Sequence, residues 1–245
     1  MDIALLTDAA KPARPAARRA ASIARATQGS LRHVARAPGP LRPWIDACTG
    51  ADLIVSGDDD DGWCDALVGS TAERIARLAQ RPVLLVRQAA RGPYRRVLVP
   101  VDFSPWSEAA VALARRVVPQ AALVLMHALD LPGEGKMRYA GVGQGVIARY
   151  RDTAERRAHE RLRALAAAAG SPGPDTVVTA DAAAPGWQIV RAAEDEDCDL
   201  AVIGKRGRHA LDELLLGSTT RRVIAESRVD ILLSALPDAP DRCPL

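Results

Sequence analysis

The sequence repeats the same order of elements twice. Residues 52–57 read Asp-Leu-Ile-Val-Ser-Gly, and residues 199–204 read Asp-Leu-Ala-Val-Ile-Gly. Each stretch is followed by a Gly-Ser-Thr triplet, an amphipathic helix pattern and a short apolar run, at 83–86 and at 231–233. Three matched elements in one order indicate an internal repeat, so the chain should fold as two related units.

Residues 88–93, which include Gly92-Pro93, are the expected linker between the units. We therefore predict two domains, residues 1–88 and 94–237. The first unit is short, because only about sixteen residues separate its second predicted strand, at 31–35, from Asp52. We expect it to lack one long helix and one strand, and so to be an incomplete copy of the second unit.

Strand and helix patterns alternate in the second unit, which predicts an α/β fold with a parallel sheet covered by helices on both faces. Strands are expected at 96–101, 122–127, 176–179, 200–203 and 231–233. Ser104-Pro105 is typical of a helix start, with serine as N-cap and proline at the first helical position. A Gly-rich loop at 131–145 should lead into a long charged helix at 146–169.

Candidate binding residues follow the predicted strands. In open parallel α/β sheets, ligands bind at the carboxyl ends of the strands. Asp102 follows the first strand of the second unit, Ala128 follows the second, and the segment 204–219 follows the fourth. The polar and Gly-rich positions should therefore gather at one edge of the sheet.

The segment 204–219 reads Gly-Lys-Arg-Gly, nine further residues, then Gly-Ser-Thr. Glycines let the backbone approach a phosphate closely. The triplet should open the next helix, where free N–H groups favour an anion. The hydroxyls of Ser218 and Thr219 add donors. Positive charge that suits a polyphosphate is expected beside them from Lys205, Arg206, Arg208 and His209. The segment is not a P-loop, because no Gly-Lys-Ser/Thr follows the strand.

These motifs resemble those of ATP-binding members of the universal stress protein family. The family's Gly-x-x-Gly, nine residues, Gly-Ser/Thr pattern is matched by Gly204, Gly207, Gly217 and Ser218. Its Pro-x-Asp-x-Ser turn is matched by Pro100, Asp102 and Ser104. The pair His127-Ala128 resembles the His-Val that typically ends the second strand.

The resemblance implies two tandem, open, twisted parallel sheets of the adenine nucleotide α-hydrolase-like class, the first incomplete. It implies ATP as the ligand, with or without Mg²⁺. Asp102, within its Pro100 turn, and the backbone near Ala128 would recognise adenine. A second set of residues would surround the ribose and phosphates: Ile203, Gly204, Arg206, Gly207, Gly217, Ser218 and Thr219.

The first unit departs from the pattern. Its loop contains Asp58-Asp59-Asp60-Asp61, and each close carboxylate–phosphate pair would repel by roughly 1 kcal/mol or more. We predict no nucleotide there. A solvated loop is the favoured interpretation of the acidic run, and a Mg²⁺ site is the alternative.

Several candidates have a simpler structural interpretation. Asp102 could be only a turn residue, and Arg206 could be a surface side chain rather than a phosphate clamp. His127 is better explained as a hydrogen-bonded core histidine than as a catalytic one. Asp212 and Glu213 could position Mg²⁺ or water, although solvated loop carboxylates are the favoured interpretation. No catalytic residue is predicted.

Composition excludes other classes. The net charge is only +3 and the arginines are scattered, which argues against nucleic-acid binding. No apolar run is long enough to span a membrane, and the N-terminus lacks a signal-peptide pattern. The four cysteines are far apart, so we predict no metal site and free thiols in the cytoplasm.

The sequence therefore favours a cytoplasmic ATP-binding protein of stress response or signalling, more a binding protein than an enzyme. A phosphoryl or nucleotidyl transferase, or a slow ATPase, is the first alternative. A transferase would need a second substrate pocket, for which the loop 131–145 is the only candidate wall. A scaffold that binds no nucleotide is the second alternative. Because the family commonly dimerises through its last strand, we expect the two units to pair through theirs, and a homodimer remains open.

Overall fold

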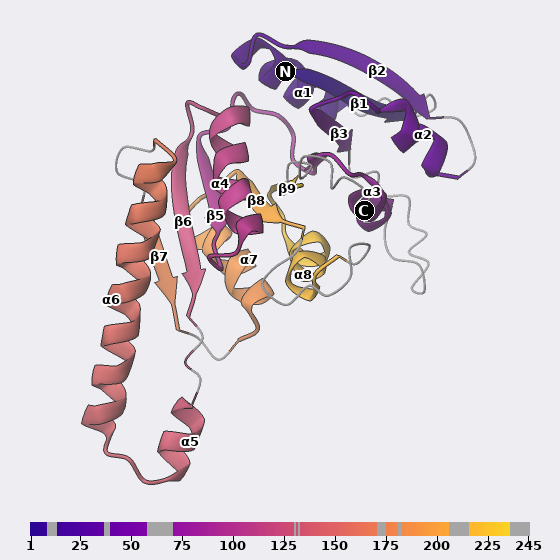
Figure 1. The fold of residues 1–245 in the computed structure, drawn as a ribbon. Helices are drawn as coiled ribbons and strands as arrows, with labels where there is room; N and C mark the ends of the chain where they lie inside the picture. Colours follow the sequence, from indigo (N-terminus) through magenta and orange to yellow (C-terminus); the bar gives the residue numbers. More distant parts are fainter. Residues whose placement is uncertain are drawn as a thin grey trace, which may run out of the picture.

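The computed structural model describes residues 1–8, 14–36, 40–57, 71–129, 131, 133–170, 175–180, 183–205 and 216–235. Within these ranges the chain forms one nine-stranded sheet, in the order β2-β1-β3-β4-β9-β8-β5-β6-β7 (Figure 1). Neighbouring strands are parallel except for β4 and β9, which are antiparallel.

The N-terminal part supplies one half of the sheet. Its elements are β1 (Asp2–Asp8), α1 (Arg14–Ala26), β2 (Ser30–Arg36), α2 (Arg42–Ala47), β3 (Leu53–Gly57), α3 (Thr71–Leu78) and β4 (Val83–Val86). The C-terminal part supplies the other half. Its elements are β5 (Arg96–Pro100), α4 (Pro105–Val117), β6 (Ala122–Ala128), α5 (Glu134–Tyr139), α6 (Gln144–Ala168), β7 (Asp175–Thr179), α7 (Pro185–Asp195), β8 (Leu200–Gly204), α8 (Ser218–Glu226) and β9 (Asp230–Ser234).

The two halves follow one plan. Read outward from the central β4–β9 pair, the N-terminal half has the order β4-β3-β1-β2, and the C-terminal half has β9-β8-β5-β6-β7. The described N-terminal residues thus lack a counterpart of β7 and of the long helix α6, as predicted. The antiparallel β4–β9 pairing also confirms that the closing strands of the two halves meet within one chain.

The similarity between the two halves extends to single hydrogen bonds. Asp52, just before β3, accepts from the backbone N–H of Asp2 through Oδ2 at 2.8 Å. Asp199, just before β8, accepts from the N–H groups of Arg95 at 2.9 Å and Arg96 at 3.2 Å. Each aspartate therefore holds the start of the first strand of its own half. The domain boundary at residues 88–94 stays a prediction, since the sheet is continuous across it.

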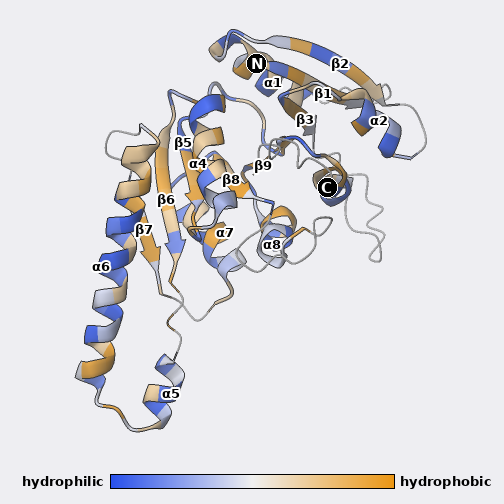
Figure 2. Ribbon diagram, viewed as in Figure 1, coloured by the Kyte–Doolittle hydropathy of each residue, from blue (hydrophilic) through white to orange (hydrophobic). Residues whose placement is uncertain are grey.

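Helices cover both faces of this sheet, and each face has its own core. One core packs α2, α3, α7 and α8 against alternate strand residues such as Leu98 and Met126. The other packs α1, α4 and α6 against the intervening residues, such as Val97 and Val99. Because both faces are covered, the central strands are mostly apolar, as the largely orange ribbons of β5, β6 and β8 show in Figure 2.

Two helix predictions have different outcomes. Ser104 is the N-cap of α4, and its hydroxyl accepts from the Ser107 N–H at 3.4 Å, as predicted. The expected loop 131–145 instead contains α5, so that prediction was wrong in part. Gly133 adopts a left-handed φ of 93° at the N-cap. Glu134 then pairs with Arg138 at 2.6 Å and Arg151 of α6 at 2.8 Å, which anchors the short helix.

Candidate functional site

Three predicted site residues end adjacent strands at the same edge of the sheet. They are Pro100 of β5, Ala128 of β6 and Gly204 of β8. Strand β5 lies between β8 and β6. After β5 the chain continues into β6 on one side of it, and it later returns to form β8 on the other side. Such a reversal opens a crevice at the carboxyl ends of the strands, which is where open α/β sheets bind ligands. Ile203, one residue before Gly204, is buried beneath this edge.

Asp102 is half-buried and shapes the turn after β5. Its Oδ1 accepts from the Ser104 N–H at 3.0 Å and from the Ser104 hydroxyl at 2.5 Å. A carboxylate that binds the backbone two residues ahead closes a local turn. Asp102 therefore fixes the entry into α4, so the turn role considered from the sequence is present.

Phe103 lies between two other side chains at this edge. Its backbone has a φ of +58°, which is rare for a bulky residue. The Arg161 guanidinium of α6 lies 3.7 Å from the ring centroid, and the His127 ring centroid lies 4.8 Å away. These contacts offset the backbone strain and hold the turn after Asp102. The sequence patterns indicated no role for Phe103 or Arg161 at this edge. The one signal for Phe103 is that it is the single phenylalanine of the chain.

His127 is hydrogen-bonded within the sheet edge. Its Nδ1 lies 2.7 Å from the carbonyl oxygen of Val101. A carbonyl can only accept, so Nδ1 carries the hydrogen and donates it. The Val101 N–H in turn donates to the Met126 carbonyl at 2.7 Å. His127 is therefore the hydrogen-bonded histidine that the sequence favoured over a catalytic one.

The end of β8 is tied to the start of α8. The Gly217 N–H donates to the Lys205 carbonyl at 3.1 Å, and the Thr220 hydroxyl donates to the Gly204 carbonyl at 2.9 Å. Thr220 is only 2% exposed, whereas Ser218 is exposed and Thr219 half-buried. Sequence reasoning selected Ser218 and Thr219 but missed Thr220, the hydroxyl that closes this loop.

The N-terminus of α8 lies beside the end of β8, and its N-cap residue provides no capping side chain. The N-cap is Gly217, which has no side chain to bond the first N–H groups of the helix. The first turn of α8 contains no acidic residue. Helix N-termini carry partial positive charge and exposed N–H donors, both of which favour an anion. No carboxylate in the first turn of α8 neutralises this partial charge or accepts from these N–H groups.

Part of the predicted site lies outside the described residues. Arg206 and Gly207 fall in the segment 206–215, together with Arg208, His209, Asp212 and Glu213. The acidic run at 58–61 also lies outside them. The roles predicted for these residues therefore stay predictions.

Lys205 corrects one expectation. Its ammonium donates to the carbonyls of Ala79 at 2.5 Å and Arg81 at 2.9 Å, and the side chain is 8% exposed. The prediction that Lys205 adds charge beside a phosphate was wrong, because burial requires that its donors be satisfied and the N-terminal part supplies the acceptors.

An open cavity of about 1500 Å³ lies elsewhere in the described part of the chain. It is at the amino ends of β5 and β8, and residues lining it include Arg95, Cys198 and Asp199. Basic and acidic side chains line it together, and burial raises the pKa of the Cys198 thiol to about 12, which suppresses its reactivity. Volume alone does not make a site, so we assign the candidate site to the opposite edge, where strand ends and the α8 N-terminus meet.

The described ranges contain no group of three or more His, Cys, Asp or Glu side chains that could hold a metal ion. Of the helices in the same ranges, none is long and apolar enough to cross a membrane.

Sequence and fold comparisons agree with this architecture. The sequence model of the Universal stress protein family matches residues 93–234. Universal stress protein MJ0577 of Methanocaldococcus jannaschii is 26% identical over 155 residues, which cover 57% of this chain and 94% of that protein. Universal stress protein Rv2005c of Mycobacterium tuberculosis is 27% identical over 211 residues, or 80% of this chain. The match spans only 65% of the length of Rv2005c.

The fold similarity extends over both halves. A universal stress protein from Archaeoglobus fulgidus superimposes with a TM-score of 0.61 at 18% identity. The match covers 96% of this chain and 97% of that one. The nine-stranded arrangement with its shortened N-terminal half is therefore a variant of a fold found among solved universal stress proteins.

Proposed function

The chain belongs to the universal stress protein family, and we propose that its C-terminal part binds ATP in a stress-response or signalling role. One observation carries the proposal. The uncapped N-terminus of α8, free of acid in its first turn, lies beyond β8 at the point where the chain reverses direction across the sheet. That combination favours the phosphates of a nucleotide.

The adenine and the phosphates of the proposed ligand would bind at different parts of the site. Asp102 and the backbone near Ala128 would recognise adenine beside the end of β5. The ribose and phosphates would lie along the end of β8 and the first turn of α8. The residues proposed for this second role are Ile203, Gly204, Arg206, Gly207, Gly217, Ser218 and Thr219. Mg²⁺, if bound, would be held mainly by the phosphates.

The described groups at this edge favour binding over catalysis. Asp102 is engaged with Ser104, and the Nδ1–H of His127 is engaged with Val101. Neither is placed to activate a water or a second substrate in this arrangement. We therefore propose that bound nucleotide sets the conformation and partner choice of a cytoplasmic protein.

Nucleotide content is the direct test. Purified protein is denatured, the released nucleotide is identified by chromatography, and stripped protein is titrated calorimetrically with ATP, ADP and AMP, with and without Mg²⁺. We expect one ATP site per chain. Two sites would show that the N-terminal part also binds, and no binding would favour the scaffold alternative.

A matched pair of variants separates charge from folding. Gly217→Asp places a carboxylate at the N-cap of α8, where aspartate stabilises a helix but repels a phosphate. Gly217→Asn supplies a similar cap without the charge. We expect ATP binding to be lost in Gly217→Asp and retained in Gly217→Asn, with both proteins folded.

The enzymatic alternative has its own signature. A phosphoryl or nucleotidyl transferase, or an ATPase, requires steady turnover of bound ATP. Turnover that disappears in Asp212→Ala or Glu213→Ala would identify a catalytic carboxylate and overturn the binding-protein proposal.

A further inference from the structure

Lys205 connects the candidate site to the N-terminal half of the chain. It is the first residue after β8, yet its ammonium donates to the carbonyls of Ala79 and Arg81, which follow α3. The C-terminal end of a helix favours a cation, because its last carbonyls lack partners within the helix. Lys205 thus provides a buried charged link between β8 and the α3–β4 connection.

The main chain of the same residue belongs to the candidate site. The Lys205 N–H donates to the Ser234 carbonyl at 3.3 Å, and its carbonyl accepts from Gly217, the N-cap of α8, at 3.1 Å. The main chain of Lys205 therefore holds the start of α8, while its side chain holds the end of α3. A ligand that fixes the first turn of α8 would also restrict Lys205.

The surrounding elements leave this link little freedom. Helices α3 and α8 lie against each other and pack into the same core. Strand β4 pairs with β9, and β9 pairs with β8, so the sheet continues from one half into the other beneath them. A change at Lys205 should therefore be transmitted to α3 and β4 rather than absorbed in a flexible joint.

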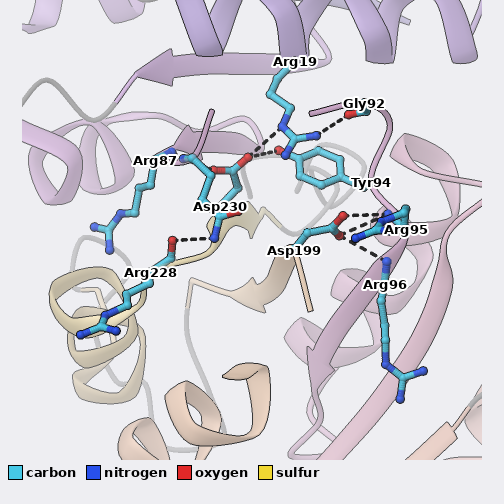
Figure 3. A network of polar contacts seen from close by, with 10 residues as sticks. Arg19, Arg87, Gly92, Tyr94, Arg95, Arg96, Asp199, Arg228 and Asp230 are labelled. Carbon is cyan, nitrogen blue, oxygen red and sulfur yellow. Dashed lines mark hydrogen bonds and ion pairs between the residues drawn. The ribbon is translucent and has the colours of Figure 1, made fainter. Parts of the chain in front are cut away.

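A second anchor lies at the opposite edge of the sheet (Figure 3). Asp230 is fully buried, and its Oδ2 accepts from Arg19 Nε at 3.0 Å and from the Tyr94 hydroxyl at 2.6 Å. Its Oδ1 accepts from the N–H groups of Arg87 at 2.7 Å and Gln88 at 2.9 Å. The described part of the N-terminal half is thus fixed at both edges, and of these two anchors the Lys205 contact is the one that adjoins the candidate nucleotide site.

We propose that Lys205 is a positioning residue that couples nucleotide binding in the C-terminal half to the α3–β4 segment of the N-terminal half. This inference rests on the proposed ATP site. Because coupling between two sites is reciprocal, ATP stabilises the Lys205 contacts with Ala79 and Arg81, and these contacts strengthen ATP binding. The incomplete N-terminal half then reports nucleotide occupancy without holding a nucleotide.

Hydrogen exchange on the full chain tests the first consequence. Exchange of peptides covering residues 75–86 is followed by mass spectrometry with and without saturating ATP and Mg²⁺. We expect ATP to slow exchange there by at least about fivefold, the lower end of typical allosteric coupling. Peptides from α5, which has no buried residue, are the internal reference.

Substitution of the lysine tests the second consequence. Lys205→Met removes the donors and keeps most of the volume, and we expect it to weaken ATP binding by about 5- to 20-fold. Lys136→Met makes the same substitution at an exposed position on α5 and should leave the affinity unchanged. If the methionine variant folds poorly, Lys205→Arg is tested in its place. This variant keeps a charged donor and should retain part of the coupling.

The outcomes separate the two proposals. If the unmodified protein does not bind ATP, the proposed function fails and the coupling fails with it. A different result overturns only the coupling. In that case the unmodified protein binds ATP, but ATP leaves hydrogen exchange at residues 75–86 unchanged, and Lys205→Met binds ATP as tightly as Lys136→Met.

Discussion

Arg19 in α1 and Asp230 at the start of β9 form a buried ion pair, with Nε and Oδ2 3.0 Å apart. They are 211 positions apart in the sequence. Arg19 also donates to the Gly92 carbonyl at 2.7 Å and lies over the Tyr94 ring, 3.9 Å from its centroid. The pair therefore fastens the first helix of the N-terminal half to the last strand of the C-terminal half.

Arg19→Met should destabilise the protein strongly. Removing one partner of a buried ion pair leaves the other charge uncompensated, which costs about 3–5 kcal/mol. Arg18→Met, at the neighbouring exposed position on α1, should change the free energy of unfolding by no more than about 0.5 kcal/mol. Urea denaturation measures both. Equal stability of the two variants would mean that the other donors to Asp230 suffice to join the halves.

Tyr94 should make stability depend on alkaline pH. Burial, and next the Asp230 carboxylate, raises the pKa of Tyr94 well above its usual value. The folded state thus favours the neutral phenol, while the unfolded state ionises near its ordinary pKa of about 10. The stabilisation is complete below about pH 10 and is lost as the pH rises above it, towards the folded-state pKa.

The free energy of unfolding should therefore decline above about pH 10 in the unmodified protein and decline less steeply in Tyr94→Phe. Denaturation at a series of alkaline pH values, with tyrosinate absorbance as a second signal, measures the difference. Tyr139→Phe controls for loss of a tyrosine hydroxyl, since that side chain is 97% exposed. Identical alkaline slopes in the unmodified protein and Tyr94→Phe would contradict the expectation.

Thr220→Val should weaken both the fold and the candidate site. Valine keeps the shape of threonine but removes the hydroxyl that donates to the Gly204 carbonyl. A buried acceptor left without its donor costs about 1–3 kcal/mol. Thr219→Val, at the half-buried neighbour, should cost less. Urea denaturation gives the stability change, and calorimetry with ATP shows whether the loosened end of β8 also lowers affinity.

Most of the helices and strands could be predicted from local sequence patterns, because their formation depends mainly on residues that are close in the sequence. The apolar runs became central strands since both faces of the sheet are covered, and Ser104-Pro105 begins α4 where a cap and a fixed φ favour it. The Gly-rich stretch was misjudged because α5 depends on Arg151, a residue of the next helix, as well as on its own sequence.

The candidate site was predicted less completely. Strand ends predicted that Pro100, Ala128 and Gly204 lie at one edge of the sheet, and the structure places them there, since the ends of parallel strands must share an edge. The same reasoning could not find Thr220 as the buried hydroxyl or Arg161 as the partner of Phe103, because such contacts depend on how distant elements pack.

The sequence by itself determined that the sheet is parallel within each half and which strand ends share one edge. Those properties follow from periodicity and the fixed geometry of parallel strands. That the chain is a shortened copy followed by a complete one, and that a ligand binds at this edge, stay predictions. Only the tertiary structure decided that Lys205 faces α3 and that Asp230 gathers Arg19 and Tyr94. A long side chain can reach several partners, and burial in the packed protein determines which of them it must satisfy.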